Sequence, residues 1–162
     1  MASESDAEQL LALNKRVEES GFMLYDPGEK QMDEGKQKEM IRRFLLGSRS
    51  LFLVAESGGM LAGFLAARGE TLNRIKHRAS IALGVDEDFQ GQGIATALFN
   101  ELFVWAKRQE IKRLELTVIK HNEKAINLYR KMGFSVEGEK IHSLMIDGKP
   151  VNEYFMYKLI EG

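Results

Sequence analysis

The sequence predicts an α/β (α+β) fold in which helices flank one mixed β-sheet. Two apolar runs, residues 50–56 and 60–68, are joined by a Ser-Gly-Gly turn, and adjacent glycines supply the positive φ angles that a tight hairpin needs. A third apolar run, residues 78–85, leads through a glycine-containing loop into a helical pattern that reaches Arg108. Because 162 residues is a usual length for one compact domain, we expect a single domain over residues 1–162.

Two helices are expected before the hairpin. The first is capped by Ser5 or Asp6, whose short polar side chains suit a helix N-terminus, and it stops at Gly21. The second begins at about Asp33 and stops at Gly47. Spacings of three and four residues place an apolar stripe on the inner face of each helix. The inward-facing residues are expected to be Leu10, Leu11, Leu13 and Val17 in the first helix, and Met40, Ile41, Phe44 and Leu45 in the second.

After the hairpin, strands and helices alternate. The helix that ends at Arg108 has two cations in its last turn, Lys107 and Arg108, which suit the negative end of the helix dipole. Gly133 suits the left-handed position that ends a short helix. The expected elements are strands at 78–85 and 113–119, a helix over 122–132, a strand at 134–137 and a hairpin around residues 147–148.

The composition excludes several classes of protein. Hydrophobic residues make up 44% of the chain and charged residues 29%, with a net charge of −1, which argues against a disordered chain and a general nucleic-acid binder. The absence of cysteine excludes disulfides, a Cys-ligated metal site and a cysteine nucleophile. The N-terminus is acidic and polar, and no apolar run has the length of a membrane span. We therefore expect a cytoplasmic protein without a metal site and without nucleic-acid or membrane partners.

The loop at residues 90–93, Gln-Gly-Gln-Gly, has the chemistry of a phosphate site. It precedes a helix, whose first N–H groups have no partner within the helix, and Gly91 and Gly93 remove side chains that would keep a phosphate away. A P-loop is excluded because no Lys followed by Ser or Thr is present. A dinucleotide fingerprint is half met, because Thr96 stands at its third glycine and the next strand ends without an acidic ribose ligand. A glycine-rich turn without a ligand is the alternative that this loop alone leaves open.

Two motifs together indicate a family. Gln90, Gly93 and Ala95 fill the pattern Q/R-x-x-G-x-G/A, and the chain from Asn122 to Phe134 reads N-x-x-A-x-x-L-Y-x-x-x-G-F. With the strand and helix between them, these residues resemble the GNAT family of acyl-CoA-dependent N-acyltransferases. The resemblance implies a mostly antiparallel mixed sheet of about six or seven strands flanked by helices, with splayed central strands that form the acyl-CoA cleft. The family usually begins with a strand, for which only about four residues precede the first helix here.

The resemblance also implies acetyl-CoA as co-substrate. The loop would surround its pyrophosphate, Val85 and Asn122 would contact its pantetheine arm, and Tyr129 matches the tyrosine that donates a proton to the departing CoA thiolate. From the helical pattern alone, Tyr129 is equally a core residue with a satisfied hydroxyl. The full set of residues implied around acetyl-CoA is Val85, Gln90, Gly91, Gln92, Gly93, Ile94, Ala95, Thr96, Asn122, Ala125, Leu128 and Tyr129.

The implied reaction is direct attack of a primary amine on the thioester in a ternary complex. Such an amine, with a pKa of ~10.4 for lysine, must lose a proton before it attacks, so a base is required. Several relatives use a glutamate on the strand that enters the loop, but residues 78–85 contain no Asp or Glu. His77, Glu115 and Glu137 are candidates, and the base stays unassigned. The alternative function is a non-catalytic acyl-CoA-binding or regulatory module on the same fold.

The acceptor is expected to be a small-molecule amine or an amine of a peptide or protein. The tail of the chain is similar to that of family members that act on protein N-termini, polyamines or small amines. In the family the acceptor groove is bounded by segments that correspond here to residues 22–33 and 141–151. Asp26, Glu29 and Asp33 could attract a cationic amine, or they could form an ordinary polar loop. The sequence does not identify the acceptor. It also does not decide between a monomer and a homodimer.

Overall fold

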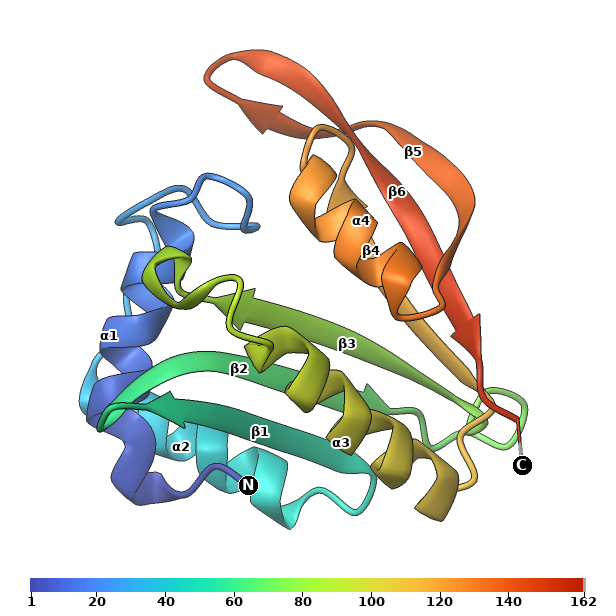
Figure 1. The fold of residues 1–162 in the computed structure, drawn as a ribbon, viewed down its shortest axis with the longest axis horizontal. Helices are drawn as coiled ribbons and strands as arrows, with labels where there is room; N and C mark the ends of the chain where they lie inside the picture. The colour runs from blue at the N-terminus through green and yellow to red at the C-terminus, as the bar shows by residue number, and fades with distance from the viewer. Residues whose placement is uncertain (162) are drawn as a thin grey trace. The chain divides into compact units, whose positions relative to one another are not determined.

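The computed structural model describes residues 1–161, in which helices and strands follow the predicted order (Figure 1). The four strands that precede Gly133 and the short helix that Gly133 ends lie within one residue of their expected bounds. The elements are η1 (Glu4–Asp6), α1 (Ala7–Glu18), α2 (Glu34–Leu46), β1 (Ser50–Ser57), β2 (Met60–Gly69), β3 (Arg78–Val85), η2 (Glu87–Phe89), α3 (Ile94–Arg108), β4 (Arg113–Ile119), α4 (Glu123–Lys131), β5 (Ser135–Ile146) and β6 (Lys149–Leu159).

The six strands form one mixed sheet in the order β1-β2-β3-β4-β6-β5. The pairs β1–β2, β4–β6 and β5–β6 are antiparallel, whereas β3 and β4 are parallel, with Arg78 opposite Arg113 and Ser80 opposite Glu115. Parallel neighbours need a crossover connection, and α3 supplies it. The expected fold class, a mostly antiparallel mixed sheet flanked by helices, is therefore confirmed.

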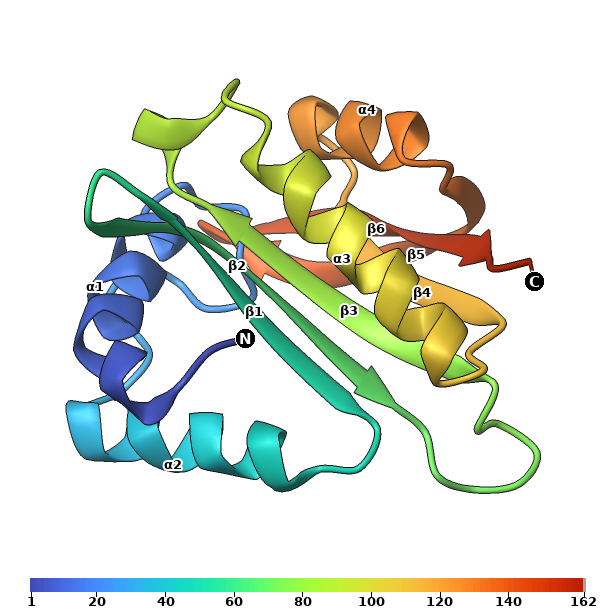
Figure 2. The ribbon, with the colours of Figure 1, turned by 60° about the horizontal axis from the view of Figure 1, so that its bottom comes forward.

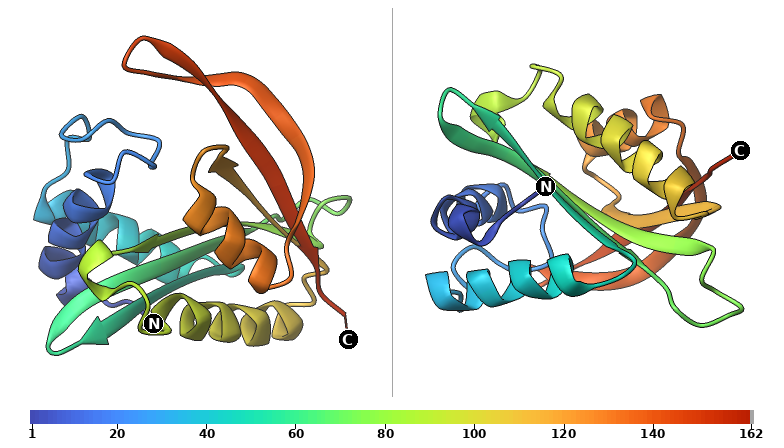
Figure 3. Two further views of the ribbon diagram at one scale, coloured as in Figure 1. Left: turned by 45° about the horizontal axis from the view of Figure 1, so that its top comes forward. Right: turned by 90° about the horizontal axis from the view of Figure 1, so that it is seen from below.

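The chain divides into two compact units. The first unit comprises residues 1–68 and 82–105. Within it, α1 and α2 cover one face of the strands and α3 covers the other (Figures 2 and 3). The apolar stripes predicted for the helices meet strand residues in a core that includes Leu10, Leu13, Val17, Ile41, Phe52, Leu61 and Phe64. On the α3 side, a Cβ at Gly63 would lie 3.2 Å from Ile94 Cγ2, so β2 and the start of α3 approach closely.

The second unit comprises residues 69–81 and 106–162, of which 162 is not described, and it holds β4, α4 and the β5–β6 hairpin. As predicted, Gly133 ends α4: its φ is 95°, and the N–H of Phe134 donates to the carbonyl of Tyr129 at 2.9 Å. This left-handed cap places the Phe134 ring 6.1 Å from the Tyr129 ring, centroid to centroid. The residue that ends the helix therefore also packs against the predicted catalytic tyrosine.

Several local expectations are wrong. Asp6 is the N-cap residue of α1, as expected, but its side chain makes no capping hydrogen bond to α1. The carboxylate of Asp6 instead accepts the N–H of Ser3 at 2.8 Å, and Ser3 is the N-cap of the preceding η1. The helix α1 ends at Glu18 rather than at Gly21. Leu45 is 44% exposed, because Gln37 and Ile41 occupy the buried positions of α2.

The end of the chain also differs from the expectation. The predicted strand at 134–137 and the first arm of the hairpin are one long strand, β5, with an irregularity between Lys140 and Leu144. Among the described residues no strand precedes α1, and the N–H of Ala2 donates to the carbonyl of Phe52 at 2.9 Å. A strand there is thus replaced by a single backbone contact to β1.

Candidate active site

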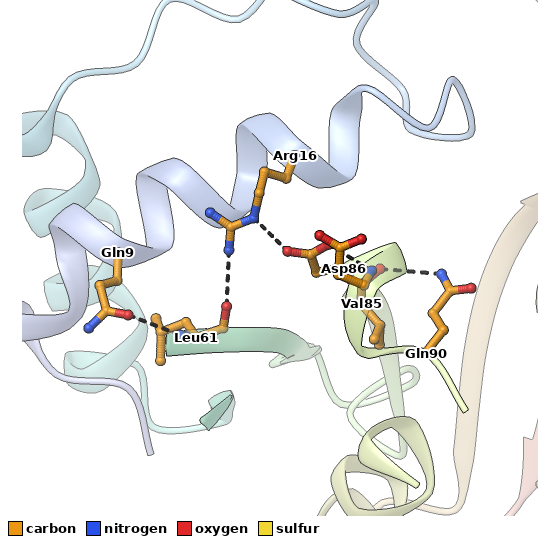
Figure 4. Close-up of polar contacts among 7 residues, drawn as sticks. Gln9, Arg16, Leu61, Val85, Asp86 and Gln90 are labelled. Carbon is orange, nitrogen blue, oxygen red and sulfur yellow. Dashed lines mark hydrogen bonds and ion pairs between the residues drawn. The ribbon is translucent and has the colours of Figure 1, made fainter. Parts of the chain in front are cut away.

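The predicted phosphate loop is anchored by a buried carboxylate that directly follows β3. Asp86 lies 2.5 Å from the Nε of Arg16 on α1, measured from its Oδ2, and the side chain of Asp86 is 7% exposed (Figure 4). Arg16 Nη2 also donates to the carbonyl of Leu61 at 3.1 Å, and the N–H of Asp86 donates to the carbonyl of Ala62 at 2.9 Å. The end of β3 is therefore tied to both α1 and β2.

The same carboxylate shapes the turn that follows. Its Oδ1 accepts the N–H of Asp88 at 3.1 Å, which starts the short helix η2. The side-chain amide of Gln90 then reaches back to the carbonyl of Val85, with an N–O distance of 3.5 Å (Figure 4). Sequence reasoning missed Arg16 and Asp86; the available signal was an acidic residue placed directly after an apolar strand.

The two glycines of the loop have the geometry that the phosphate hypothesis requires. Gly91 and Gly93 adopt φ angles of 80° and 79°, a region that side chains disfavour. A Cβ at either position would meet no described atom within 4 Å, so the backbone of this loop is open to a ligand. The carbonyl of Gly93 accepts the N–H of Ala97 at 3.0 Å, which makes Gly93 the residue that begins α3.

The first turn of α3 carries no acidic residue, whereas those of α1, α2 and α4 contain Glu8, Glu34 and Glu123. Carboxylates near a helix N-terminus offset its partial positive charge, and here that charge is left for another anion. By helix geometry, the N–H groups of residues 94–96 have no partner one turn earlier. An open glycine backbone beside an acid-free helix start fits the pyrophosphate of an acyl-CoA.

The second predicted motif lies on α4, in the second unit. Asn122 caps the helix, with its Oδ1 accepting the N–H of Ala125 at 3.3 Å. Ala125 and Leu128 are half-buried, whereas Tyr129 is 8% exposed. Burial raises the pKa of Tyr129 to about 12, because the phenolate would lose its hydration. The hydroxyl therefore stays protonated throughout the neutral pH range and can act as a hydrogen-bond donor.

The three candidate bases fall in less suitable places. Glu115 and Glu137 both accept hydrogen bonds from the guanidinium of Arg113, at 2.9 and 2.7 Å. These contacts, first of all that with Glu137, raise the pKa of Arg113. His77 is exposed at the start of β3, where its carbonyl accepts the N–H groups of Lys112 and Arg113. Two of the three candidates are thus committed to a structural ion pair.

Of the acidic residues expected to attract an amine, Asp33 has its carboxylate engaged in a structural contact. Asp33 caps α2 and accepts the N–H of Lys36 at 2.8 Å. The carbonyl of Asp26 accepts the N–H of Glu29 at 3.0 Å in a turn. Residues 22–33 are mostly exposed, and Lys30 lies 5.3 Å above the ring of Tyr25. This segment therefore has local structural contacts that account for Asp33 without an acceptor.

Residues 1–161 contain no group of three or more His, Cys, Asp or Glu side chains arranged to hold a metal ion. In the same residues, no helix is both long and apolar enough to cross a membrane.

Comparison with known proteins identifies the family. The sequence profile of the Acetyltransferase (GNAT) family matches residues 16–134, from Arg16 through the phosphate loop and α4 to Phe134. The chain belongs to the GNAT family. The resemblance that Gln90, Gly93 and the α4 motif suggested is thereby confirmed.

Two relatives of this GNAT chain come from Escherichia coli (strain K12). Spermidine N(1)-acetyltransferase is 36% identical over 97 residues, which cover 59% of this chain and 51% of that protein. L-amino acid N-acetyltransferase AaaT is 32% identical over 108 residues, which cover 66% of this chain and 67% of that protein. The chain thus spans about half the length of the spermidine N(1)-acetyltransferase that it matches.

Solved structures share the GNAT fold. An acetyltransferase of the GNAT family from Streptococcus pneumoniae has a TM-score of 0.91 and 26% identity, with 99% of this chain and 96% of that chain covered. The protein yncA from Salmonella typhimurium, solved with its cofactor acetyl-CoA, has a TM-score of 0.86 and 18% identity, with 99% and 92% covered. The whole described fold therefore has counterparts among GNAT structures.

The first prediction concerns the Arg16–Asp86 pair. Replacing Asp86 by Asn removes the charge opposite Arg16 in a buried position, and we expect the free energy of unfolding to fall by about 2 kcal/mol. This is less than the roughly 3–5 kcal/mol of a fully buried pair, because the Arg16 side chain is 32% exposed. Urea denaturation of both proteins at neutral pH measures the difference.

The control is Arg42→Met, which breaks an ion pair of similar length, 2.7 Å to Glu4, between two well-exposed side chains. It should change stability little, since solvent screens such pairs. Equal losses in the two variants would show that burial does not strengthen the Arg16–Asp86 contact.

Proposed function

We propose that this protein is an acetyl-CoA-dependent N-acetyltransferase that moves an acetyl group to a primary amine by direct attack in a ternary complex. The observation that carries the proposal is the glycine-lined, acid-free start of α3 in a GNAT chain. Residues 1–162 would act as one acetyltransferase domain, since the family profile runs through residues of both compact units. The chain has no cysteine, so the acetyl group would pass directly to the amine, without an acyl-cysteine.

The loop residues would bind acetyl-CoA through backbone as much as through side chains. The N–H groups of the loop and of the first turn of α3 would donate to the pyrophosphate, and Thr96 would add a hydroxyl. The carbonyl and N–H of Val85 would contact the pantetheine arm, as would the side chain of Asn122. The remaining residues proposed around acetyl-CoA are Gln90, Gly91, Gln92, Gly93, Ile94, Ala95, Ala125 and Leu128.

Tyr129 would stabilise the departing CoA thiolate. Its pKa of about 12 is above the ~10 of an ordinary phenol and further above the ~8.5 of a thiol. Complete proton transfer to the sulfur is therefore less favourable than it would be from an exposed tyrosine. We propose a hydrogen bond from the hydroxyl that strengthens as charge develops on the sulfur, which is stabilisation confined to the transition state.

The acceptor would be an amine. One relative is named for spermidine and another for L-amino acids, and both classes present an amino group. A peptide or protein amine and a homodimer stay predictions from the sequence, as does the cytoplasmic location. A screen of acetyl-CoA consumption across polyamines, amino acids, peptides and aminoglycosides tests the function; consumption with no amine would favour the non-catalytic acyl-CoA-binding module.

The second prediction tests the loop through Gly93→Val. Acetyl-CoA should raise the melting temperature of the wild type, and NAD should raise it much less. At a hundredfold excess over its dissociation constant, acetyl-CoA should add roughly 2.7 kcal/mol to the free energy of unfolding. In the variant a branched side chain would stand where phosphate oxygens approach, so this stabilisation should be lost. Thermal unfolding with and without acetyl-CoA is the measurement.

Gly59→Val is the matched control. Gly59 has a φ of 83°, close to that of Gly93, and its Cβ position is likewise open, so the backbone strain is similar. This control should lose stability and keep the shift with acetyl-CoA. A folded Gly93→Val protein with an unchanged shift would remove the phosphate site from the proposal.

The third prediction concerns Tyr129→Phe. The ring stays, so its packing against Phe134 should persist. If the hydroxyl stabilises the leaving thiolate, turnover at saturating acetyl-CoA should fall by about two orders of magnitude, with affinity for acetyl-CoA little changed. Tyr157→Phe, which removes the hydroxyl of a half-buried tyrosine on β6, is the control and should keep normal turnover. Normal turnover with about 1 kcal/mol of lost stability would make Tyr129 a core residue.

The fourth prediction follows from the raised pKa of Tyr129. In the unfolded chain its pKa returns to about 10, so between pH ~10 and ~12 the unfolded state binds fewer protons than the folded state. The resulting contribution to the free energy of unfolding is roughly 2–3 kcal/mol. It is complete below pH ~10 and is lost as the pH rises through ~12. Tyr129→Phe should lack it, so the wild type should lose more stability than the variant between pH 9 and 12. Parallel alkaline losses would contradict the burial of the phenol.

A further inference from the structure

The second unit contains a groove of about 520 Å³ beside the start of α4. Its lining comes from the end of β4, the residue before the α4 cap, the irregular part of β5 and the start of β6. The lining residues are Lys120, His121, His142, Pro150, Val151 and Asn152. We propose that His142, on the wall of this groove, is the general base that takes a proton from the acceptor amine. The proposal rests on the proposed N-acetyltransferase function.

His142 stands in a bulge that interrupts the pairing of β5 with β6. The pairs on either side of the bulge are Lys140↔Glu153 and Leu144↔Val151. Three residues of β5, 141–143, therefore lie opposite one residue of β6, Asn152, so β5 has two more residues here than regular pairing requires. Bulges are common beside active sites, where they redirect a side chain out of the regular alternation of a strand. Here the redirected segment forms part of the groove wall.

The backbone at the bulge is strained and held in place. His142 has a φ of 51°, in the left-handed region that residues other than glycine seldom adopt. Its N–H donates to Asn152 Oδ1 at 2.7 Å, and Asn152 Nδ2 donates to Glu139 Oε2 at 2.7 Å. Lys120 Nζ lies 3.1 Å from Glu139 Oε1. Strain of this kind persists only where neighbours enforce it, and it clusters at functional sites. The residues that enforce it, Lys120 and Asn152, also line the groove.

Chemistry narrows the choice of base among the lining residues. A charged lysine has no lone pair with which to accept a proton, and Pro, Val and Asn side chains do not take up a proton near neutral pH. The two histidines, His121 and His142, are the lining residues that remain. The neighbouring carboxylates are engaged: Glu139 accepts from Lys120 and Asn152, and Glu153 lies 3.6 Å from the Nζ of Lys140. The hydrogen bond from Lys120 comes first among the causes that lower the pKa of Glu139, which makes it a poor proton acceptor.

The step balances without a further reactant. The nitrogen of the neutral amine, which is in equilibrium with the ammonium form in solvent, attacks the thioester carbonyl carbon, so a C–N bond forms and the C–S bond breaks. The proton leaves the nitrogen for a ring nitrogen of His142, and the hydroxyl of Tyr129 donates to the sulfur. The thiolate keeps its hydrogen bond from Tyr129 and takes its proton from solvent, His142 passes the proton of the amine to water, and the products are the N-acetylated amine and CoA.

The test is His142→Asn, assayed with an amine that the wild type acetylates. Asn also tolerates the left-handed region, so the bulge can keep its shape while the imidazole is removed. The ratio of wild-type to variant kcat/KM cancels the ionisation of the amine itself. We expect a ratio of about 10² or more at pH 8, which falls toward unity as the pH is lowered through the range in which histidines titrate, roughly pH 5–8.

A complete histidine scan supplies the controls, because the chain has three histidines. His77→Asn and His121→Asn should leave the pH dependence of kcat/KM unchanged. Asn152→Ala removes the acceptor for the backbone N–H of His142 and should lower kcat/KM. In the double variant with His142→Asn, kcat/KM should be little lower than in His142→Asn alone.

The outcomes separate the two proposals. Suppose that the wild type is active and the pH dependence of kcat/KM is unchanged in His142→Asn, or is lost in His77→Asn or His121→Asn instead. Either result would overturn the role of His142 and leave the acetyltransferase function standing. A wild type that binds no acetyl-CoA, or acetylates no amine, would overturn the function and the base with it.

Discussion

The position of the predicted phosphate loop depends on one buried carboxylate, that of Asp86. A charge in the interior must be paired, and Asp86 finds its partner in Arg16, which lies 70 positions earlier in the chain on α1. The same aspartate receives the N–H of Asp88, so one side chain ends β3, starts η2 and joins both to the first helix. The glycines that follow can adopt positive φ angles without loss of position because the segment before them is fixed at two points.

Apart from the Asp86 anchor, the groups that this loop offers to an anion are backbone atoms. Open glycines and an acid-free helix start offer N–H groups and a partial positive charge, neither of which depends on a flexible side chain. A side chain that binds a phosphate must be ordered when the ligand arrives, whereas these groups are already fixed by α3. This explains why short-range sequence patterns were enough to locate the loop.

The same distinction separates what the sequence predicted from what it did not. Strand and helix bounds follow from apolar periodicity and glycine position, both local properties, and β3 and β4 match their expected ranges. The Arg16–Asp86 pair joins distant residues, so a local pattern can single out Asp86 at the end of its strand but cannot identify Arg16 as its partner. The bulge at residues 141–143 is held by a hydrogen bond that the N–H of His142 donates to the side chain of Asn152 on β6. Leu45 was misplaced because a polar residue, Gln37, is buried in the same helix. Features of the proposed site that local backbone fixes, such as the glycine loop, could be predicted from the sequence, whereas side-chain contacts between distant residues could not.

The two proposed proton-handling groups occupy opposite environments, and each environment suits its task. A donor to the leaving thiolate must hold its proton at working pH, and burial ensures this for Tyr129 by raising its pKa to about 12. A base must be able to release its proton to water after each turnover, and His142 is exposed on a groove wall. A buried histidine could not exchange with solvent, and an exposed phenol would begin to ionise near pH ~10. The buried position keeps the proton on the Tyr129 hydroxyl, and the exposed position gives the imidazole of His142 a route to pass its proton to water.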